Sequence, residues 1–175
     1  MIYDYKWQTE SGTLDCYVDT DFAGCHTTRR STSGGAALHG GHLLKHYSNT
    51  QSTVALKSGE AEVGGICKGA SIGLGLQSVA QDLGLTWSLS VHSDATAAIG
   101  ICRRKGLGKI RHLAVADLWV QERVRSGDFK LLKVLGTDNP ADMMTKHITR
   151  EQLIKHATCI GCKFITGRPG IAPSI

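Results

Sequence analysis

Apolar and polar residues alternate along the segment from Thr13 to Asp19, T-L-D-C-Y-V-D. A period of two predicts a β-strand with one apolar face, and this strand ends in Asp19, just before a turn that contains glycine. Further on, Gly40 and Gly41 separate two short apolar segments and suit the positive φ angles of a tight hairpin turn. The first three strands are therefore expected to form an antiparallel meander.

Longer helical and strand-like segments follow the meander. Ser58 is expected to cap a helix that continues to about Leu83 and stops at Gly84, although its glycines each cost roughly 1 kcal/mol of helix stability relative to alanine. Between this helix and Lys146, the sequence pattern predicts a strand at 87–92, a helix at 95–102, a helix from about 113 to 127 and a strand at 129–135. The last predicted element is a helix that Asn139 caps, with Pro140 at its first position. Beyond Lys146 the pattern of apolar and polar residues weakens.

This order of strands and helices predicts a mixed α/β sheet, because helices connect the third strand to the fourth and the fourth to the fifth. If the fourth strand lies parallel to the first, Asp19 and Asp94 emerge at neighbouring carboxyl ends of the sheet. Glu62 on the first long helix and Asp142 on the last helix could reach the same place. Four carboxylates can gather only if a cation neutralises them, and oxygen ligands favour Mg²⁺ or Mn²⁺.

Glu60 and Glu62 cannot both face this place, because positions two apart on a helix point about 200° from each other. The register of Ile66, an apolar residue four positions after Glu62, favours Glu62. We therefore expect Glu62 to join the other carboxylates.

Composition and charge narrow the class of protein. The chain has 175 residues, of which 41% are hydrophobic, and this suits one globular domain with a buried core. Residues 1–12 are expected to be the remnant of a connection, residues 13–146 the domain, and residues 147–175 a partly disordered extension that is mobile at 166–175. The sequence has no apolar run of bilayer length and no signal peptide, which predicts an intracellular protein that is neither secreted nor in a membrane. A net charge of +5 favours a polyanionic partner.

The six cysteines are scattered along the chain, and we expect them to be reduced thiols. In the tail, His156, Cys159 and Cys162 could bind zinc, but their spacing fits no strong zinc pattern. We therefore expect no metal in the tail.

The segment 103–111 is a basic loop with glycines, in which five of nine residues are cationic. Such a run is more often a solvated surface than a binding patch, but its place beside the expected carboxylates favours contact with phosphate. The cations are Arg103, Arg104, Lys105, Lys109 and Arg111, and they are followed by His112.

Several stretches resemble the RNase H domain of copia-type LTR retrotransposons, the C-terminal part of a reverse transcriptase polyprotein. The matching stretches are V-D-T-D-F-A-G (18–24), R-R-S-T-S-G (29–34), E-A-E (60–62), S-D (93–94), the loop and helix 109–122, and N-P-A-D through T-K (139–146). The resemblance implies an RNase H fold, a five-stranded mixed sheet in the order 3-2-1-4-5 flanked by helices, and a site at Asp19, Glu62, Asp94 and Asp142. The sequence departs from the family at Val63, Gly64, Gly65 and Ala114.

The resemblance also implies an activity, the two-metal hydrolysis of the RNA strand of RNA/DNA hybrids. Two Mg²⁺ ions, for which Mn²⁺ can substitute, would share Asp19. An upstream reverse transcriptase polymerase domain is the implied partner in the parent polyprotein. His112 would transfer a proton or help the cleaved 5′-phosphate leave, although a helix-terminal or partly buried ring is a histidine's plainer role. Contacts to 2′-hydroxyls are expected from backbone amides near Glu62 and along the polar stretch from His26 to Ser33, which contains Arg29, Arg30, Ser31 and Thr32.

Two other functions could use the same residues. A domesticated, catalytically silent copy would bind hybrid or double-stranded RNA without cutting it, and an RNase H-fold DNA nuclease or transposase would use the carboxylates on DNA. The complete set of four carboxylates argues against the first, and a match over several ordered motifs argues against the second. The resemblance therefore favours a ribonuclease H, with these two functions as the alternatives.

Overall fold

The computed structural model describes residues 2–106 and 115–164. Its main sheet has five strands in the order β4-β3-β2-β5-β6, which confirms the expected order and the mixed α/β class. The strands β2, β3 and β4 form the antiparallel meander, whereas β5 runs parallel to β2 and β6 parallel to β5. The strand bounds are Thr13–Asp21 for β2, Thr32–His39 for β3, His42–Thr50 for β4, Ser88–Ser93 for β5 and Lys130–Lys133 for β6.

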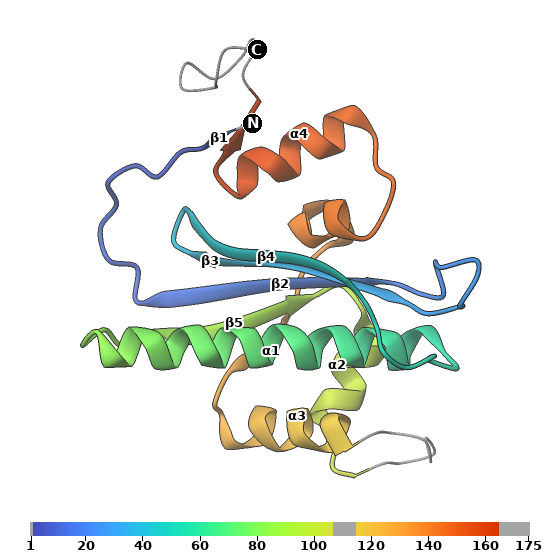
Figure 1. The fold of residues 1–175 in the computed structure, drawn as a ribbon. Coiled ribbons are helices and arrows are strands. Elements are labelled where there is room, and N and C mark those ends of the chain that lie inside the picture. The colour runs from blue at the N-terminus through green and yellow to red at the C-terminus, as the bar shows by residue number, and fades with distance from the viewer. Residues whose placement is uncertain (1, 107–114, 165–175) are drawn as a thin grey trace.

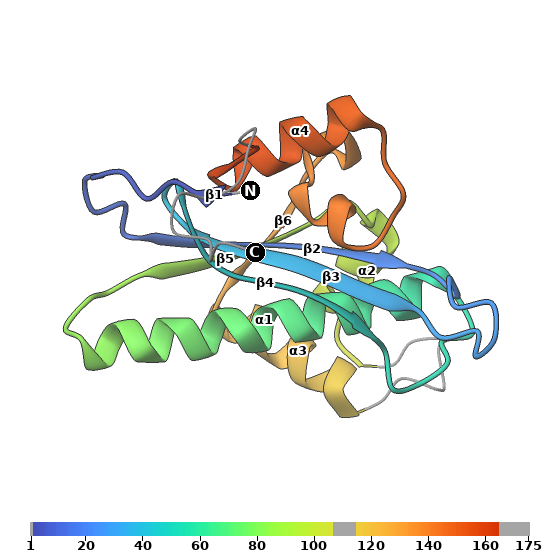
Figure 2. The ribbon, with the colours of Figure 1, turned by 45° about the horizontal axis from the view of Figure 1, so that its top comes forward.

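Helices cover both faces of this sheet (Figure 1). One face packs against α1 (Ser58–Asp82), α2 (Thr96–Arg103) and α3 (Val115–Ser126). The other face is covered by the 3₁₀ helix η2 (Pro140–Met144), which follows η1 (Gly136–Asp138), and by α4 (Arg150–Cys159). Figure 2 shows the sheet between its two groups of helices from a second direction. None of the described helices is long and apolar enough to cross a membrane.

The central strand β2 is buried from both sides at its carboxyl end. Val18, Asp19 and Thr20 are all at most 4% exposed, because α1 covers one face of the strand and η2 the other. A polar residue in such a place needs partners, since an unpaired buried charge is costly. This end of β2 is therefore the expected place of a functional site.

Three glycines on one side of α1 let the helix lie close to the sheet. A Cβ on Gly65 would lie 2.5 Å from Oγ1 of Thr20, and a Cβ on Gly73 would lie 2.6 Å from Cδ1 of Leu89. A Cβ on Gly69 would overlap Cγ1 of Val18. The glycines are four residues apart, so they form one stripe along the helix. They weaken the isolated helix, but they permit its close approach to the strands β2 and β5.

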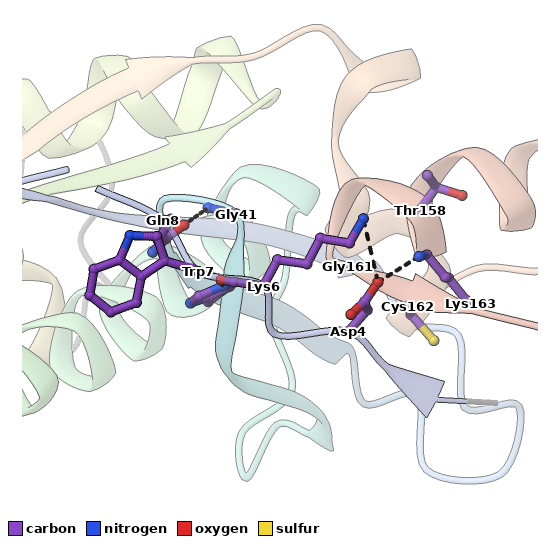
Figure 3. Close-up of a pocket in the computed structure, with 10 residues that line it drawn as sticks. Asp4, Lys6, Trp7, Gln8, Gly41, Thr158, Gly161, Cys162 and Lys163 are labelled. Atoms are coloured by element: carbon purple, nitrogen blue, oxygen red, sulfur yellow. Dashed lines mark hydrogen bonds and ion pairs between the residues drawn. The ribbon is translucent and has the colours of Figure 1, made fainter. Parts of the chain in front are cut away.

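The two ends of the described chain meet on the same side of the molecule. The short strand β1 (Ile2–Tyr3) pairs antiparallel with β7 (Cys162–Lys163). Lys163 also donates a hydrogen bond of 2.5 Å to Asp4, and Gln8 accepts one from the backbone N–H of Gly41 at the β3–β4 turn (Figure 3). The division into a domain and two flanking segments stays a prediction.

Several local predictions need correction. The N-cap of α1 is Lys57 rather than Ser58, and no side chain caps it. The element capped by Asn139 is a 3₁₀ helix. The helix α4 was not expected, although Thr149 and Gln152 form a capping box at its start. The expected mobility of residues 166–175 lies outside the described residues.

Candidate active site

Asp19 lies near the end of β2 and is only 1% exposed. Its Oδ1 accepts a hydrogen bond of 2.9 Å from the ammonium group of Lys146, and its Oδ2 accepts one from the hydroxyl of Thr145. These donors can come close because Asp19 pairs in the sheet with Gly34. A Cβ on Gly34 would lie 2.7 Å from Cγ2 of Thr145. A glycine on β3 thus lets the segment after η2 approach the buried carboxylate.

Glu62 approaches the same place from the first turns of α1. This end of the helix is held on the sheet by hydrogen bonds from Thr20 and Gln51 to the carbonyl of Ala61, at 3.4 and 2.8 Å. Glu60 points elsewhere, because its Oε2 accepts a hydrogen bond from the backbone N–H of Leu56. The structure therefore brings Glu62, and not Glu60, to Asp19.

The environment of Glu62 disfavours its charged form. Burial, followed by the charges of Asp19 and Asp94, raises the pKa of Glu62 from 4.5 to about 8, although the charge of Lys146 acts in the opposite direction. Its Oε2 is buried and has no hydrogen-bond partner among the described residues. A cation bound here would pair with this buried oxygen, which lacks a donor, and would offset the negative charge around it.

Asp94 directly follows β5, and the parallel pairing of β5 with β2 brings it beside Asp19 as expected. The carboxylates of Asp19, Glu62 and Asp94 each offer an oxygen, and these oxygens lie within 4.8 Å of one another. Among the side chains that the structure describes, this is the only such group of three or more potential metal ligands. It consists of oxygen donors alone, which suits Mg²⁺ or Mn²⁺ better than zinc.

Asp142 is placed by the cap of η2. The buried side chain of Asn139 accepts a hydrogen bond from the backbone N–H of Ala141 and donates one of 2.9 Å to the carbonyl of Val18. Asp142 stands outside the group of three, but its Oδ1 accepts a hydrogen bond of 3.0 Å from Lys146, which also binds Asp19. Burial raises the pKa of Asp142, and the charge of Asp19 adds to this effect.

The residues expected to bind nucleic acid have different surroundings. Arg29 and Arg30 are exposed on the loop before β3, whereas Ser31 is buried and its hydroxyl accepts a hydrogen bond from the N–H of Ala23. Thr32 begins β3 and pairs with Asp21 and Thr50. Ser31 therefore supports the loop rather than facing solvent.

The basic loop is described only in part. Arg103 donates a hydrogen bond of 2.6 Å to the carbonyl of Leu131 on β6, while Lys105 is exposed and Arg104 is half-buried. Lys109, Arg111 and His112 lie outside the described residues.

The three tail residues considered as zinc ligands differ in their surroundings, and the absence of a metal in the tail stays a prediction. His156 and Cys162 are buried, Cys159 is exposed, and these three do not form a group of close ligands in the part of the chain that the structure describes. None of the six cysteines, all of which are described, is in a disulfide.

Sequence reasoning missed the direct contacts of Thr145 and Lys146. Both belong to the matching T-K motif, but neither was assigned to the site. The spacing of Asp142 and Lys146, four residues apart, is a signal for an ion pair. No local signal points to Asp19, which lies 127 residues before Lys146 in the sequence.

Comparisons with known proteins agree with this geometry. The chain is 30% identical over 141 residues to the retrovirus-related Pol polyprotein from transposon TNT 1-94 of Nicotiana tabacum, a match over 79% of this chain. It is 28% identical over 151 residues to the corresponding polyprotein from transposon RE1 of Arabidopsis thaliana, a match over 85% of the chain. The chain is a homologue of plant retrotransposon Pol polyproteins. It spans only 11% and 10% of the length of these two relatives, and no protein-family model matches it.

Solved structures identify the fold of this chain as that of RNase H. LC11-RNase H1, isolated from compost, superposes with a TM-score of 0.57 at 14% identity, over 77% of this chain and 93% of that one. The same enzyme in complex with an RNA/DNA hybrid gives a TM-score of 0.53 at 12% identity, over 76% and 94%. The N-terminal RNase H domain of rv2228c from Mycobacterium tuberculosis gives 0.50 at 18% identity, over 83% and 96%. The RNase H fold and the Pol relatives together agree with the copia-type RNase H domain expected from the sequence.

Proposed function

We propose that the chain is a metal-dependent endoribonuclease that hydrolyses the RNA strand of RNA/DNA hybrids in retrotransposon reverse transcription. The observation that carries this proposal is the convergence of Asp19, Glu62 and Asp94 from three separate elements to within 4.8 Å. The RNase H fold supports the class of reaction, and the Pol relatives support its setting. A structural neighbour solved with an RNA/DNA hybrid supports the choice of substrate.

Asp19, Glu62, Asp94 and Asp142 would hold two Mg²⁺ ions, for which Mn²⁺ can substitute. Bound there, the ions supply a nucleophilic water and stabilise the charge of the leaving oxygen. The orphaned oxygen of Glu62 supports a cation at this place. The role of the chain is to keep four carboxylates close together and oriented, and Asn139 and Gly34 contribute by fixing η2 against β2 and β3.

Binding of the hybrid would use positive charge near the site. Arg29, Arg30 and Lys105 are exposed cations that can contact phosphates without first breaking an ion pair among the described residues. Lys109, Arg111 and His112 continue the same basic segment in the sequence. A polymerase domain of the parent polyprotein would act as the partner that delivers the hybrid, within an intracellular particle or the nucleus.

A substrate panel tests this function. RNA/DNA hybrid, duplex DNA and duplex RNA are incubated with the chain, with Mg²⁺ or with EDTA, and the strand that is cut is identified by its label. We expect cleavage of the RNA strand of the hybrid in Mg²⁺ only. Cleavage of duplex DNA in place of the hybrid would indicate an RNase H-fold DNA nuclease, and binding of hybrid without any cleavage would indicate a catalytically silent module.

A further inference from the structure

Lys146 lies between two of the carboxylates that the proposed function assigns to metal ions. Its ammonium nitrogen is 2.9 Å from Oδ1 of Asp19 and 3.0 Å from Oδ1 of Asp142. The second oxygen of Asp19 already accepts a hydrogen bond from Thr145. Both oxygens of this buried carboxylate therefore have donors within the protein, and Asp19 needs no metal ion to be satisfied.

On the other side of the carboxylate cluster, Glu62 and Asp94 lack such partners among the described residues. The Oε2 of Glu62 is buried without a hydrogen-bond partner, and no described ion pair joins Glu62 or Asp94 to a cation. A single ammonium group thus pairs with both Asp19 and Asp142 and offsets one of their two negative charges, while no described ion pair involves the other two carboxylates. The negative charge of the metal-free site is therefore offset in part, and only on the side of Asp19 and Asp142.

We propose, building on the metal site of the proposed function, that Lys146 is an internal counter-cation that competes with a divalent ion. In the metal-free protein it would hold Asp19 and Asp142 together, and a divalent ion bound to the same two oxygens would have to displace it. Two cations cannot share these oxygens without strong repulsion at such short separations. The side chain of Lys146 is 39% exposed, so a displaced ammonium group can move into solvent.

Few described interactions would hold the Lys146 side chain in place once a divalent ion displaced it from the two carboxylates. Lys146 follows the end of η2, and its ammonium group makes its described ion pairs only with Asp19 and Asp142. The lysine side chain is a flexible stem with a point charge, which suits reversible pairing better than the rigid fork of arginine. Metal binding would therefore exchange one cation for another without moving the backbone of the site.

The test follows the melting temperature of the whole chain during a titration with Mn²⁺ in the absence of nucleic acid. Lys146→Met removes the charge and keeps the length of the side chain. In EDTA it is expected to lower the melting temperature by roughly 2–8 °C. It is also expected to tighten the apparent Kd for Mn²⁺ by about tenfold or more, the equivalent of about 1.4 kcal/mol.

Two further variants separate charge from general effects of substitution. Lys146→Arg keeps the charge and is expected to bind Mn²⁺ no more tightly than the wild type. Lys155→Met is the matched control, because Lys155 forms an ion pair of 2.6 Å with Asp138 and has no contact with the carboxylate cluster. It should leave the Kd for Mn²⁺ unchanged.

Each outcome decides between the alternatives. If the wild type binds Mn²⁺ and Lys146→Met binds it equally or less tightly, the competition is overturned while the metal site stands. If neither protein binds Mn²⁺, the metal site of the proposed function is overturned together with the competition. If Lys146→Met does not fold in EDTA, folding of Lys146→Arg supports the counter-cation, and failure of Lys146→Arg to fold overturns it.

Discussion

Glu62→Gln measures how strongly the clustered carboxylates oppose the metal-free fold. The folded protein raises the pKa of Glu62 from 4.5 to about 8, so between these values the folded state holds a proton that the unfolded state releases. The stability of the wild type must then fall as pH rises from about 4.5 to about 8, and the whole penalty is present above that range. Glutamine has no charge to lose, so its presence removes this pH dependence.

The magnitude follows from the two pKa values. Because one unit of pKa is about 1.4 kcal/mol, the penalty is ~1 kcal/mol at pH 5 and ~4 kcal/mol at pH 8. The advantage of Glu62→Gln over the wild type should therefore grow by about 3 kcal/mol from pH 5 to pH 8. For a chain of this size that corresponds to about 6–12 °C in melting temperature. Burying the amide of the new glutamine side chain lowers this advantage by a similar amount at both pH values, so it does not change the difference in stability between pH 5 and pH 8.

The assay is thermal unfolding in EDTA at pH 5 and pH 8, with wild type, Glu62→Gln and Glu60→Gln. Glu60 is the matched control, because it lies two residues earlier on α1 and its carboxylate accepts a hydrogen bond from Leu56 outside the cluster. The Glu60 variant should show the same difference from wild type at both pH values. An equal difference for Glu62→Gln at pH 5 and pH 8, or a less stable Glu62→Gln at pH 8, would refute the assigned environment of Glu62.

Three further predictions concern packing, capping and the basic loop. Gly69→Ala should destabilise the fold by roughly 1–3 kcal/mol in urea unfolding, because its Cβ would overlap Val18. Gly75→Ala is the control, since no heavy atom lies near its Cβ, and it should stabilise the fold by about 0.5–1 kcal/mol. The opposite order of stabilities would refute the close approach of α1 to the sheet. Asn139→Ala should cost about 2–3 kcal/mol, because it removes a helix cap and leaves a buried carbonyl on β2 unpaired, and an unchanged unfolding midpoint would contradict this. His112→Ala should slow turnover by about 10²–10⁴-fold without weakening Mn²⁺ binding, and its single-turnover rate should suffer less than its steady-state rate if product release is its task; wild-type rates in both regimes would remove it from the mechanism.

Much of the sheet was predictable because its signals are local. Alternation marked the strands at 13–19 and 87–92, and Gly40 marked the hairpin with its positive φ. The helices between strands indicated crossover connections, while the strand order itself, with β5 parallel to β2, came from the family resemblance. The approach of Asp94 to Asp19 followed from that pairing alone. The group of three carboxylates could therefore be anticipated from residues that are far apart in the sequence.

The remaining features depend on which surfaces meet. The glycines of α1 were counted as a weakness of the helix, and only the contacts with Thr20, Val18 and Leu89 show why three of them are needed. The ion pair of Lys146 with Asp19 joins segments that the sequence does not connect by any local pattern. The helix α4 buries only His156 and Ala157, so it has no strong apolar stripe, although its capping box could have been found.

Cleavage of an RNA/DNA hybrid by wild type and Asp19→Asn tests the central claim most directly. The matched control is Asp15→Asn on the same strand, because Asp15 accepts a hydrogen bond from His92 at 2.8 Å and takes no part in the carboxylate cluster. With Mg²⁺, wild type and Asp15→Asn should cut the RNA strand and leave 5′-phosphate ends, while Asp19→Asn should bind the hybrid and leave it intact. Cleavage that persists in EDTA, or full activity of Asp19→Asn, would contradict the account.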